Sequence, residues 1–201
     1  MKIYLARHGQ STWQLDPGDD LDTPLSATGR RQASLLASWL AEHPALDSEG
    51  RLEVVALRTS PLRRAQETAD YVVQTLHLPV QVQPTLAEAP FHVVEELPRA
   101  SDPYRPRPSG YELSQRYRSF REQARAALDE LAALSEEMGG PVLAVTHGGL
   151  IKTMLRVIAD TDLTCFKIYN TGIAAVDWKD GRWRLLQVNL WDHLPPELRL
   201  T

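Results

Sequence analysis

Arginine and histidine side chains follow three apolar segments, each where a strand is expected to end. RHG at 7–9 follows the apolar run at 4–6, and THGG at 146–149 follows PVLAV at 141–145. A third segment, RTSPLRRA at 58–65, places three arginines around the expected start of a helix. Ligands of open α/β sheets bind beyond the carboxyl ends of the strands, so we expect these residues to meet there.

Two histidines, at least two arginines and a helix N-terminus together suit a phosphate dianion. Arginine binds phosphate with paired hydrogen bonds, and the free amides of a helix N-terminus add donors. A histidine beside the phosphate can act as nucleophile and take the phosphoryl group on a ring nitrogen. Phosphoryl transfer depends mainly on positioning and charge neutralisation, which two arginines and a cationic histidine could supply without a metal.

Alternating strands and helices must position these residues. Apolar periodicity predicts strands at 2–6, 52–60, 78–84 and 141–147, helices at 26–43, 60–76, 112–137 and 148–159, and a hairpin at 172–189. Ser60 is the expected N-cap of the second helix, with Pro61 at its first position. The order predicts an α/β fold, a three-layer α/β/α sandwich whose central sheet is mostly parallel. The continuously apolar strand at 141–147 is expected at its centre.

One domain is expected to span residues 1–201, because no repeat, low-complexity tract or linker divides the chain. A proline-rich stretch at about 90–110 is longer than an ordinary connection. We interpret it as a lid-like insertion within that domain, since such loops often carry binding residues.

Composition argues against several other classes of protein. With 43% hydrophobic residues, 24% charged residues and a net charge of −4, nothing general favours nucleic acid or an anionic membrane as partner. A single cysteine, Cys165, excludes an internal disulfide and any zinc site made of several cysteines. No secretion signal or membrane-spanning stretch is apparent, so we expect a cytoplasmic protein. The oligomeric state is left open, with a homodimer as one option.

Several motifs, in this order, resemble those of the histidine phosphatase superfamily, also called phosphoglycerate-mutase-like, in its branch 1. They are LARHGQST at 5–12, PLSATGRRQA at 24–33, TSPLRRAQETA at 59–69, LAE at 86–88, VTHGG at 145–149 and VNLWDHL at 188–194. The resemblance covers nearly the whole chain. It implies a phosphatase without metal or other cofactor that hydrolyses a small-molecule phosphomonoester through a phosphohistidine.

The resemblance implies a role for each matching residue. His8 aligns with the phosphorylated nucleophile, and Arg7 and Arg64 align with the arginines that clamp the phosphate. His147 aligns with the second histidine, which contacts the phosphoryl group and stabilises its developing charge. Glu88 aligns with the proton donor.

An acid is needed because an alkoxide is a poor leaving group. The same carboxylate, once ionised, can activate the water that hydrolyses the phosphohistidine, so its pKa should lie above the solution value. Many family members follow this glutamate with glycines, whereas this chain reads EAPFHVVEELP from Glu88 onward. Glu95 and Glu96 are therefore alternative candidates for the acid.

Other residues near the first motif are expected to complete the phosphate pocket. Gln14 stands where the family often has a phosphate-binding asparagine, and Ser11 stands where threonine is usual. Gln10 and Gly148 are further candidates for phosphate or substrate binding. The acidic run DPGDDLDTP at 16–24 replaces an Arg-x-Gln-Gly of the family, which leaves the substrate open.

Three alternatives to a phosphatase remain at this stage. The first is a cofactor-dependent phosphoglycerate mutase, although this chain is short for one. The second is a non-catalytic phosphate-binding module, and the third is a metal site on His8 and His147, which has few acidic ligands nearby. Seven arginines between 99 and 125 are interpreted mainly as a solvated helix face, with Arg105 and Arg107 the best candidates for reaching substrate. Arg63 is expected on a helix surface.

Overall fold

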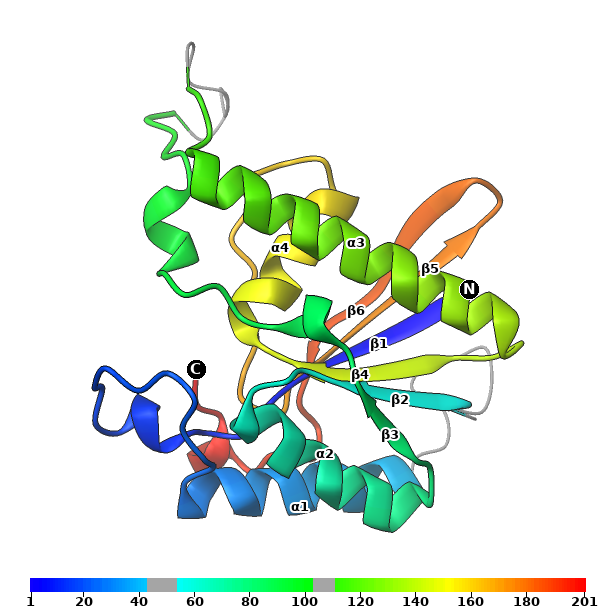
Figure 1. Ribbon diagram of the computed structural model, residues 1–201. Helices are drawn as coiled ribbons and strands as arrows, with labels where there is room; N and C mark the ends of the chain where they lie inside the picture. Colours follow the sequence, from blue (N-terminus) through cyan, green and yellow to red (C-terminus); the bar gives the residue numbers. More distant parts are fainter. Residues whose placement is uncertain (43–53, 103–110) are drawn as a thin grey trace.

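Six strands and four α-helices make up the part of the chain that the computed structural model describes, residues 1–42, 54–102 and 111–201 (Figure 1). The strands are β1 Lys2–Arg7, β2 Ala56–Thr59, β3 Val80–Val82, β4 Val142–Thr146, β5 Ile173–Lys179 and β6 Arg182–Leu190. The helices are α1 Ala27–Glu42, α2 Arg63–Leu76, α3 Gln115–Glu137 and α4 Gly148–Ile158. Short 3₁₀ turns occupy Thr12–Gln14, Pro84–Leu86, Val93–Glu96 and Pro196–Leu198.

The six strands form one mostly parallel sheet in the order β3-β2-β4-β1-β5-β6. Neighbours among β3, β2, β4 and β1 pair in parallel, while β5 pairs antiparallel with both β1 and β6. Every residue of β4 is buried, as its apolar sequence predicts for a strand between two others. The predicted fold class and the central place of this strand are confirmed.

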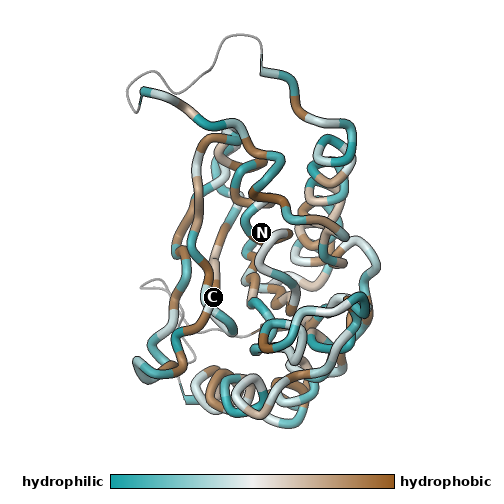
Figure 2. The backbone as a smooth tube through the Cα atoms, turned by 90° about the vertical axis from the view of Figure 1, so that its left-hand side faces the viewer, coloured by the Kyte–Doolittle hydropathy of each residue, from teal (hydrophilic) through white to brown (hydrophobic). Residues whose placement is uncertain are grey.

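Helices cover both faces of the sheet, with α1 and α2 on one side and α3 and α4 on the other (Figure 1). Successive side chains of a strand point to opposite faces. In β1, Ile3 and Leu5 join the core beneath α3 and α4, and Tyr4 and Ala6 join the core beneath α1 and α2. The helix traces change between hydrophobic and hydrophilic along each turn (Figure 2), as amphipathic helices on a sheet must.

The start of α2 lies later than predicted. The helix begins at Arg63 and not at Pro61, and its N-cap position is Leu62. Oγ of Ser60 accepts from the N–H of Leu62 at 3.2 Å, just before the helix, and also lies 2.7 Å from Nε2 of His147. The backbone N–H of Arg63, the first residue of the helix, donates to Oδ1 of Asp22 at 2.6 Å. A carboxylate from the loop after β1 thus satisfies the first amide of the helix.

Other predicted boundaries agree more closely with the structure. Ser26 accepts from the N–H of Gly29 at 3.0 Å and so caps α1, whereas α3 begins three residues later than expected, capped by Ser114. The hairpin turns at Asp180 and Gly181, both with positive φ, as a tight β-hairpin requires. The ends of the predicted elements at 26–43 and 52–60, together with Arg105 and Arg107, lie outside the described residues.

The carboxyl ends of β1, β4 and β2 lie side by side. Arg7 is in register with Thr146, and the N–H of His8 donates to the carbonyl of Thr146 at 2.8 Å. On the other side of β4, the N–H of Ser60 donates to the carbonyl of Val145 at 3.0 Å. The segments that follow β1 and β3 both extend beyond this edge of the sheet (Figure 1). This edge therefore gathers the residues that the sequence singled out.

Candidate active site

The two histidines leave neighbouring parallel strands at the same level, and their rings lie close together, tilted by 58°. His8 follows β1 and His147 follows β4, and their ring centroids are 5.0 Å apart. Both side chains are buried. Burial lowers the pKa of His8 well below its usual value, and His147, Arg7 and Arg64 lower it further. Burial, followed by the two arginines, does the same to the pKa of His147.

His8 presents an unprotonated ring nitrogen. Its Nδ1 lies 2.6 Å from the carbonyl oxygen of Gly9, and because a carbonyl only accepts, Nδ1 carries the proton. The other nitrogen, Nε2, accepts a hydrogen bond from Nε of Arg64 at 3.2 Å. The lowered pKa keeps the ring neutral, so Nε2 carries the lone pair that a histidine nucleophile needs; in this structure that lone pair accepts the hydrogen bond from Arg64.

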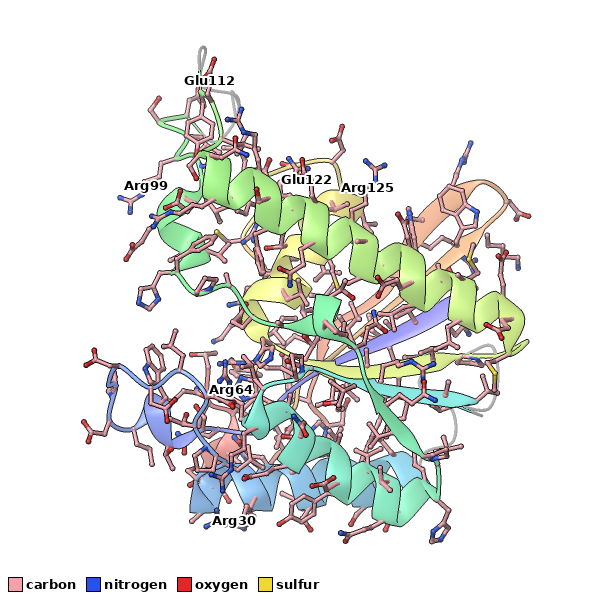
Figure 3. The ribbon with its side chains drawn as sticks, viewed as in Figure 1. Arg30, Arg64, Arg99, Glu112, Glu122 and Arg125 are labelled. Carbon is pink, nitrogen blue, oxygen red and sulfur yellow. The ribbon has the colours of Figure 1, made fainter. Side chains whose placement is uncertain are left out.

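Two arginines surround this histidine. Arg64, in the first turn of α2, is buried and is labelled in Figure 3 beside the start of that helix. Arg7, at the end of β1, donates through Nη1 to the carbonyl of Ile168 at 2.8 Å, while its buried Nε has no partner among the described residues. Burial, partly offset by Glu88, lowers the pKa of Arg7 to about 10. Both guanidinium groups remain cationic at neutral pH and can bind an anion.

Arg58 and Arg63, which accompany Arg64 in the sequence, do not join this cluster. Arg58 lies within β2 and donates to the carbonyl of Leu57 at 3.3 Å. Arg63 is at the surface, where its Nε lies 2.8 Å from Oε1 of Glu67. Because a helix turns by about 100° per residue, Arg63 and Arg64 point in different directions.

Glu88 lies where the N-terminus of α4 meets the segment after β3. Its Oε2 accepts from the N–H of Gly149 at 2.8 Å, and its Oε1 accepts from the N–H of Ala89 at 3.0 Å. Burial raises the pKa of Glu88, although these two amides and then Arg64 and Arg7 oppose the rise. Burial thus shifts the carboxyl group toward its protonated form, even though Arg64 and Arg7 are close enough to favour the ionised form.

A cavity of about 680 Å³ opens onto these groups. Of the predicted site residues, it is lined by Arg7, His8, Ser11, Gln14, Arg64, Glu88 and Gly148. Its apolar wall is formed by Trp13, Leu21, Leu62, Phe91, Val93, Val94 and Phe166. Polar groups therefore converge at one place in a largely apolar hollow, as is typical of small-molecule sites.

Gln14 and Ser11 lie at the cavity as predicted. The amide of Gln14 exchanges two hydrogen bonds of 3.1 Å with the amide of Asn170, and its Oε1 also accepts from the N–H of Ser11 at 3.1 Å. Gln10 points elsewhere, because its Oε1 accepts from Oγ of Ser26 at 2.8 Å beside α1. We therefore interpret Gln10 as a residue that positions the loop and not as a phosphate ligand.

His147 is the one expected catalytic residue that does not line the cavity. It is completely buried, its Nε2 lies 2.7 Å from Oγ of Ser60, and its Nδ1 has no partner among the described residues. Its ring centroid lies 5.0 Å from that of His8, which does line the cavity.

The alternative acids and the arginine-rich region lie away from the cavity. Glu96 accepts hydrogen bonds from Ser114 and Arg116 at the start of α3, and Glu95 is exposed. Arg121 pairs with Asp162 at 2.7 Å. Figure 3 places Arg99 and Arg125 on the outside of the molecule near α3, far from Arg64. Arg116, Arg118 and Arg125 are exposed on α3, as expected of a solvated helix face, whereas Arg121 is half-buried and Arg99 precedes the helix.

Sequence reasoning missed several residues of the cavity. Lys152 and Arg156 line it from α4, one helical turn apart. Their spacing from Gly149 places them on the same face of the helix, so the periodicity alone could have indicated them. Asn170, which holds Gln14, lies in an irregular segment before β5 and gives no comparable signal.

Within residues 1–42, 54–102 and 111–201, no three His, Cys, Asp or Glu side chains are grouped so that they could hold a metal ion. None of the helices in the same ranges is both long enough and apolar enough to cross a membrane.

The fold and the site define a class of protein. The sequence profile of the histidine phosphatase superfamily (branch 1) matches residues 3–190. The chain therefore belongs to that superfamily. Together with its relatives and structural neighbours, which are phosphatases or phosphoglycerate-mutase-like proteins, this identifies it as a phosphoric monoester hydrolase.

Individual relatives match along most of their length. The chain is 26% identical over 208 aligned residues to the uncharacterized phosphatase PhoE of Bacillus subtilis (strain 168), covering 96% of each chain. It is 27% identical to the probable phosphoglycerate mutase GpmB of Yersinia enterocolitica, covering 91% of this chain and 87% of that protein. A phosphoserine phosphatase mutant of Entamoeba histolytica, solved with phosphoserine, shares the fold with a TM-score of 0.72 at 24% identity, covering 96% and 99% of the two chains.

Proposed function

We propose that this protein is a metal-independent phosphatase that hydrolyses a small-molecule phosphomonoester through a phosphohistidine on His8. One observation carries the proposal: the unprotonated Nε2 of His8 lies at the cavity, 3.2 Å from Nε of Arg64. A neutral imidazole beside fixed cations is suited to attack a phosphate ester, because the cations offset the charge of the anion that approaches.

In the first half-reaction, Arg7 and Arg64 hold the oxygens of the phosphoryl group. Nε2 of His8 forms a bond to phosphorus as the bond to the alcohol oxygen breaks. Protonated Glu88 gives its proton to that oxygen, so a neutral alcohol leaves. The raised pKa of Glu88 favours the protonated form that this step needs.

In the second half-reaction, the ionised Glu88 takes a proton from a water molecule that attacks phosphorus. The bond to Nε2 breaks, and inorganic phosphate leaves with His8 neutral again. We assign to His147 the stabilisation of the charge that develops in both steps, from its position 5.0 Å from His8 between ring centroids. Arginines supply the charge neutralisation that a metal supplies in other phosphoryl-transfer sites.

A labelling experiment tests this proposal. The purified protein is mixed with ³²P-labelled p-nitrophenyl phosphate and quenched within milliseconds in alkali, where phosphohistidine survives. We expect label on His8, and we expect His8→Ala to lose both label and turnover while remaining folded. His77→Asn is the matched control, because His77 is exposed and an asparagine tolerates its left-handed backbone. Full turnover in His8→Ala would contradict the mechanism.

Two further assays separate this proposal from its competitors. Activity is measured after dialysis against excess chelator, and we expect no loss. The protein is also given 3-phosphoglycerate with 2,3-bisphosphoglycerate, because the relative from Yersinia enterocolitica bears the name of a mutase. Rapid formation of 2-phosphoglycerate would show a mutase, and the absence of both label and turnover across a broad phosphoester panel would show a binding module.

A further inference from the structure

Two cations at the cavity have no part in the mechanism proposed above. Lys152 and Arg156 both line it from α4. Residues four apart in a helix are neighbours on one face, and like charges at that spacing repel each other. A bound anion beside Lys152 and Arg156 would relieve this repulsion, so the pair favours anion binding.

Arg156 is buried and has no counter-ion among the described residues. Its side chain is only 3% exposed, Nε donates to the carbonyl of Thr164 at 3.0 Å, and Nη1 has no partner among the described residues. Asp162, two positions before Thr164, is already bonded to Tyr117 at 2.8 Å and Arg121 at 2.7 Å. A buried guanidinium group without a paired anion is costly, so this position favours binding of a negative group.

Lys152 connects this arginine to the catalytic cluster. Neither a hydrogen bond nor an ion pair engages its ammonium group within the described residues. Burial and then Arg7 lower the pKa of Lys152, Glu88 opposes them, and Arg156 lowers it again. Along one face of α4, Lys152 stands between Gly149, whose N–H holds Glu88, and Arg156.

The described side chains that line the cavity are mostly cationic. Arg7, Arg64, Lys152 and Arg156 carry positive charges, and Glu88 is the acidic side chain among them. Arg7 and Arg64 are assigned to the phosphoryl group, which leaves Lys152 and Arg156 for a second negative group. We infer that Lys152 and Arg156 form a second anion-binding subsite, so the preferred substrate carries a carboxylate or a second phosphate on its alcohol part.

This inference rests on the proposed phosphatase function, but ligands that cannot be hydrolysed test it separately. The ligands are ω-phosphonocarboxylates with two to five methylenes, bisphosphonates of the same lengths, and ω-hydroxyalkylphosphonates, in which a neutral CH₂OH replaces the carboxylate. Isothermal titration calorimetry gives each dissociation constant. The carboxylate and bisphosphonate series show which anion the subsite prefers, and the length series finds the span between the two sites.

We expect the wild-type protein to bind the best carboxylate or bisphosphonate roughly tenfold or more tightly than its hydroxy counterpart, as a charge-assisted hydrogen bond supplies. Lys152→Met removes the charge but keeps the length, and it should abolish most of that preference while weakening the hydroxy ligand much less. Lys152→Arg should retain the preference. Lys167→Met is the matched control, because Lys167 is exposed and lies outside the cavity lining.

Equal affinity of the wild-type protein for charged and hydroxy ligands at every length would overturn the subsite. An equal loss of affinity for charged and hydroxy ligands in Lys152→Met would also overturn it, because a general change in the electrostatic field of the cavity gives that result. The ³²P labelling is run on the same preparations. Labelled His8 without a charge preference refutes the subsite alone, and a charge preference without label refutes the phosphatase while the subsite stands.

Discussion

Opposing effects act on the pKa of Glu88, as suits a residue that must both give and take a proton. Burial favours its protonated form, whereas the amides of Gly149 and Ala89 stabilise the ionised form. A group that must give a proton in one half-reaction and take one in the next needs neither form to be strongly preferred. Among the three candidate acids, Glu88 lines the cavity, whereas Glu95 and Glu96 do not.

Glu88→Gln should separate the two half-reactions. With p-nitrophenyl phosphate the leaving group needs no proton, so we expect a burst of one nitrophenol per active site. Turnover should then slow by roughly 10²- to 10⁴-fold, because no base activates the water. Stopped-flow absorbance measures the burst, and phosphohistidine should accumulate in parallel. With an alkyl phosphate we expect no burst, and a burst of the same size there would contradict the role of Glu88 as acid.

Elements that depend on local pattern were predictable, and contacts across the chain were not. The apolar run of β4 indicated a central strand, and the ends of three strands indicated one site. The predicted start of α2 was wrong: the first amide of the helix is bonded to Asp22, 41 positions before Arg63, and no local signal records that bond. The contact of Gln10 was unpredictable for the same reason, since its partner Ser26 belongs to the cap of α1.

The N-terminus of α4 positions Glu88 by close approach. A Cβ on Gly149 would lie 2.5 Å from Oε1 of Glu88, so no side chain fits there without moving the carboxyl group. We expect Gly149→Ala to lower kcat for alkyl phosphates at least tenfold, although alanine favours the helix itself. Circular dichroism should show an intact fold. Gly18→Ala is the control, because a Cβ there would meet nothing within 4 Å, and full activity in Gly149→Ala would refute this positioning.

Across the whole molecule, burial of neutral histidines links stability to pH. The pKa values of His8, His147 and His193 are all lowered by burial. Each stays neutral in the folded state but takes up a proton on unfolding when the pH is below its usual value. The contribution of these three histidines to stability is therefore complete above about pH 6.5 and is lost as the pH falls below it.

His193 offers a way to measure this linkage outside the catalytic cluster. Burial lowers its pKa from 6.5 to about 4, and Nε2 lies 3.0 Å from Oγ1 of Thr171. The shift corresponds to a loss of roughly 3 kcal/mol between those pH values. We expect His193→Gln to show a shallower fall in unfolding free energy from pH 7 to pH 4.5, measured with urea. His77→Asn should keep the wild-type slope, and equal slopes in both variants would contradict the assignment.

Hydrogen bonds hold both ends of the segment from Glu88 to Glu96. Glu88 is held by the amide of Gly149, and eight positions later Glu96 is held by Ser114 and Arg116 at the start of α3. Between these anchors, His92 and Val94 line the cavity yet are exposed. Evolution or a protein engineer can therefore vary these two positions to reshape the substrate pocket while the acid stays in place. Such an arrangement allows one catalytic centre to acquire new substrates by point mutation.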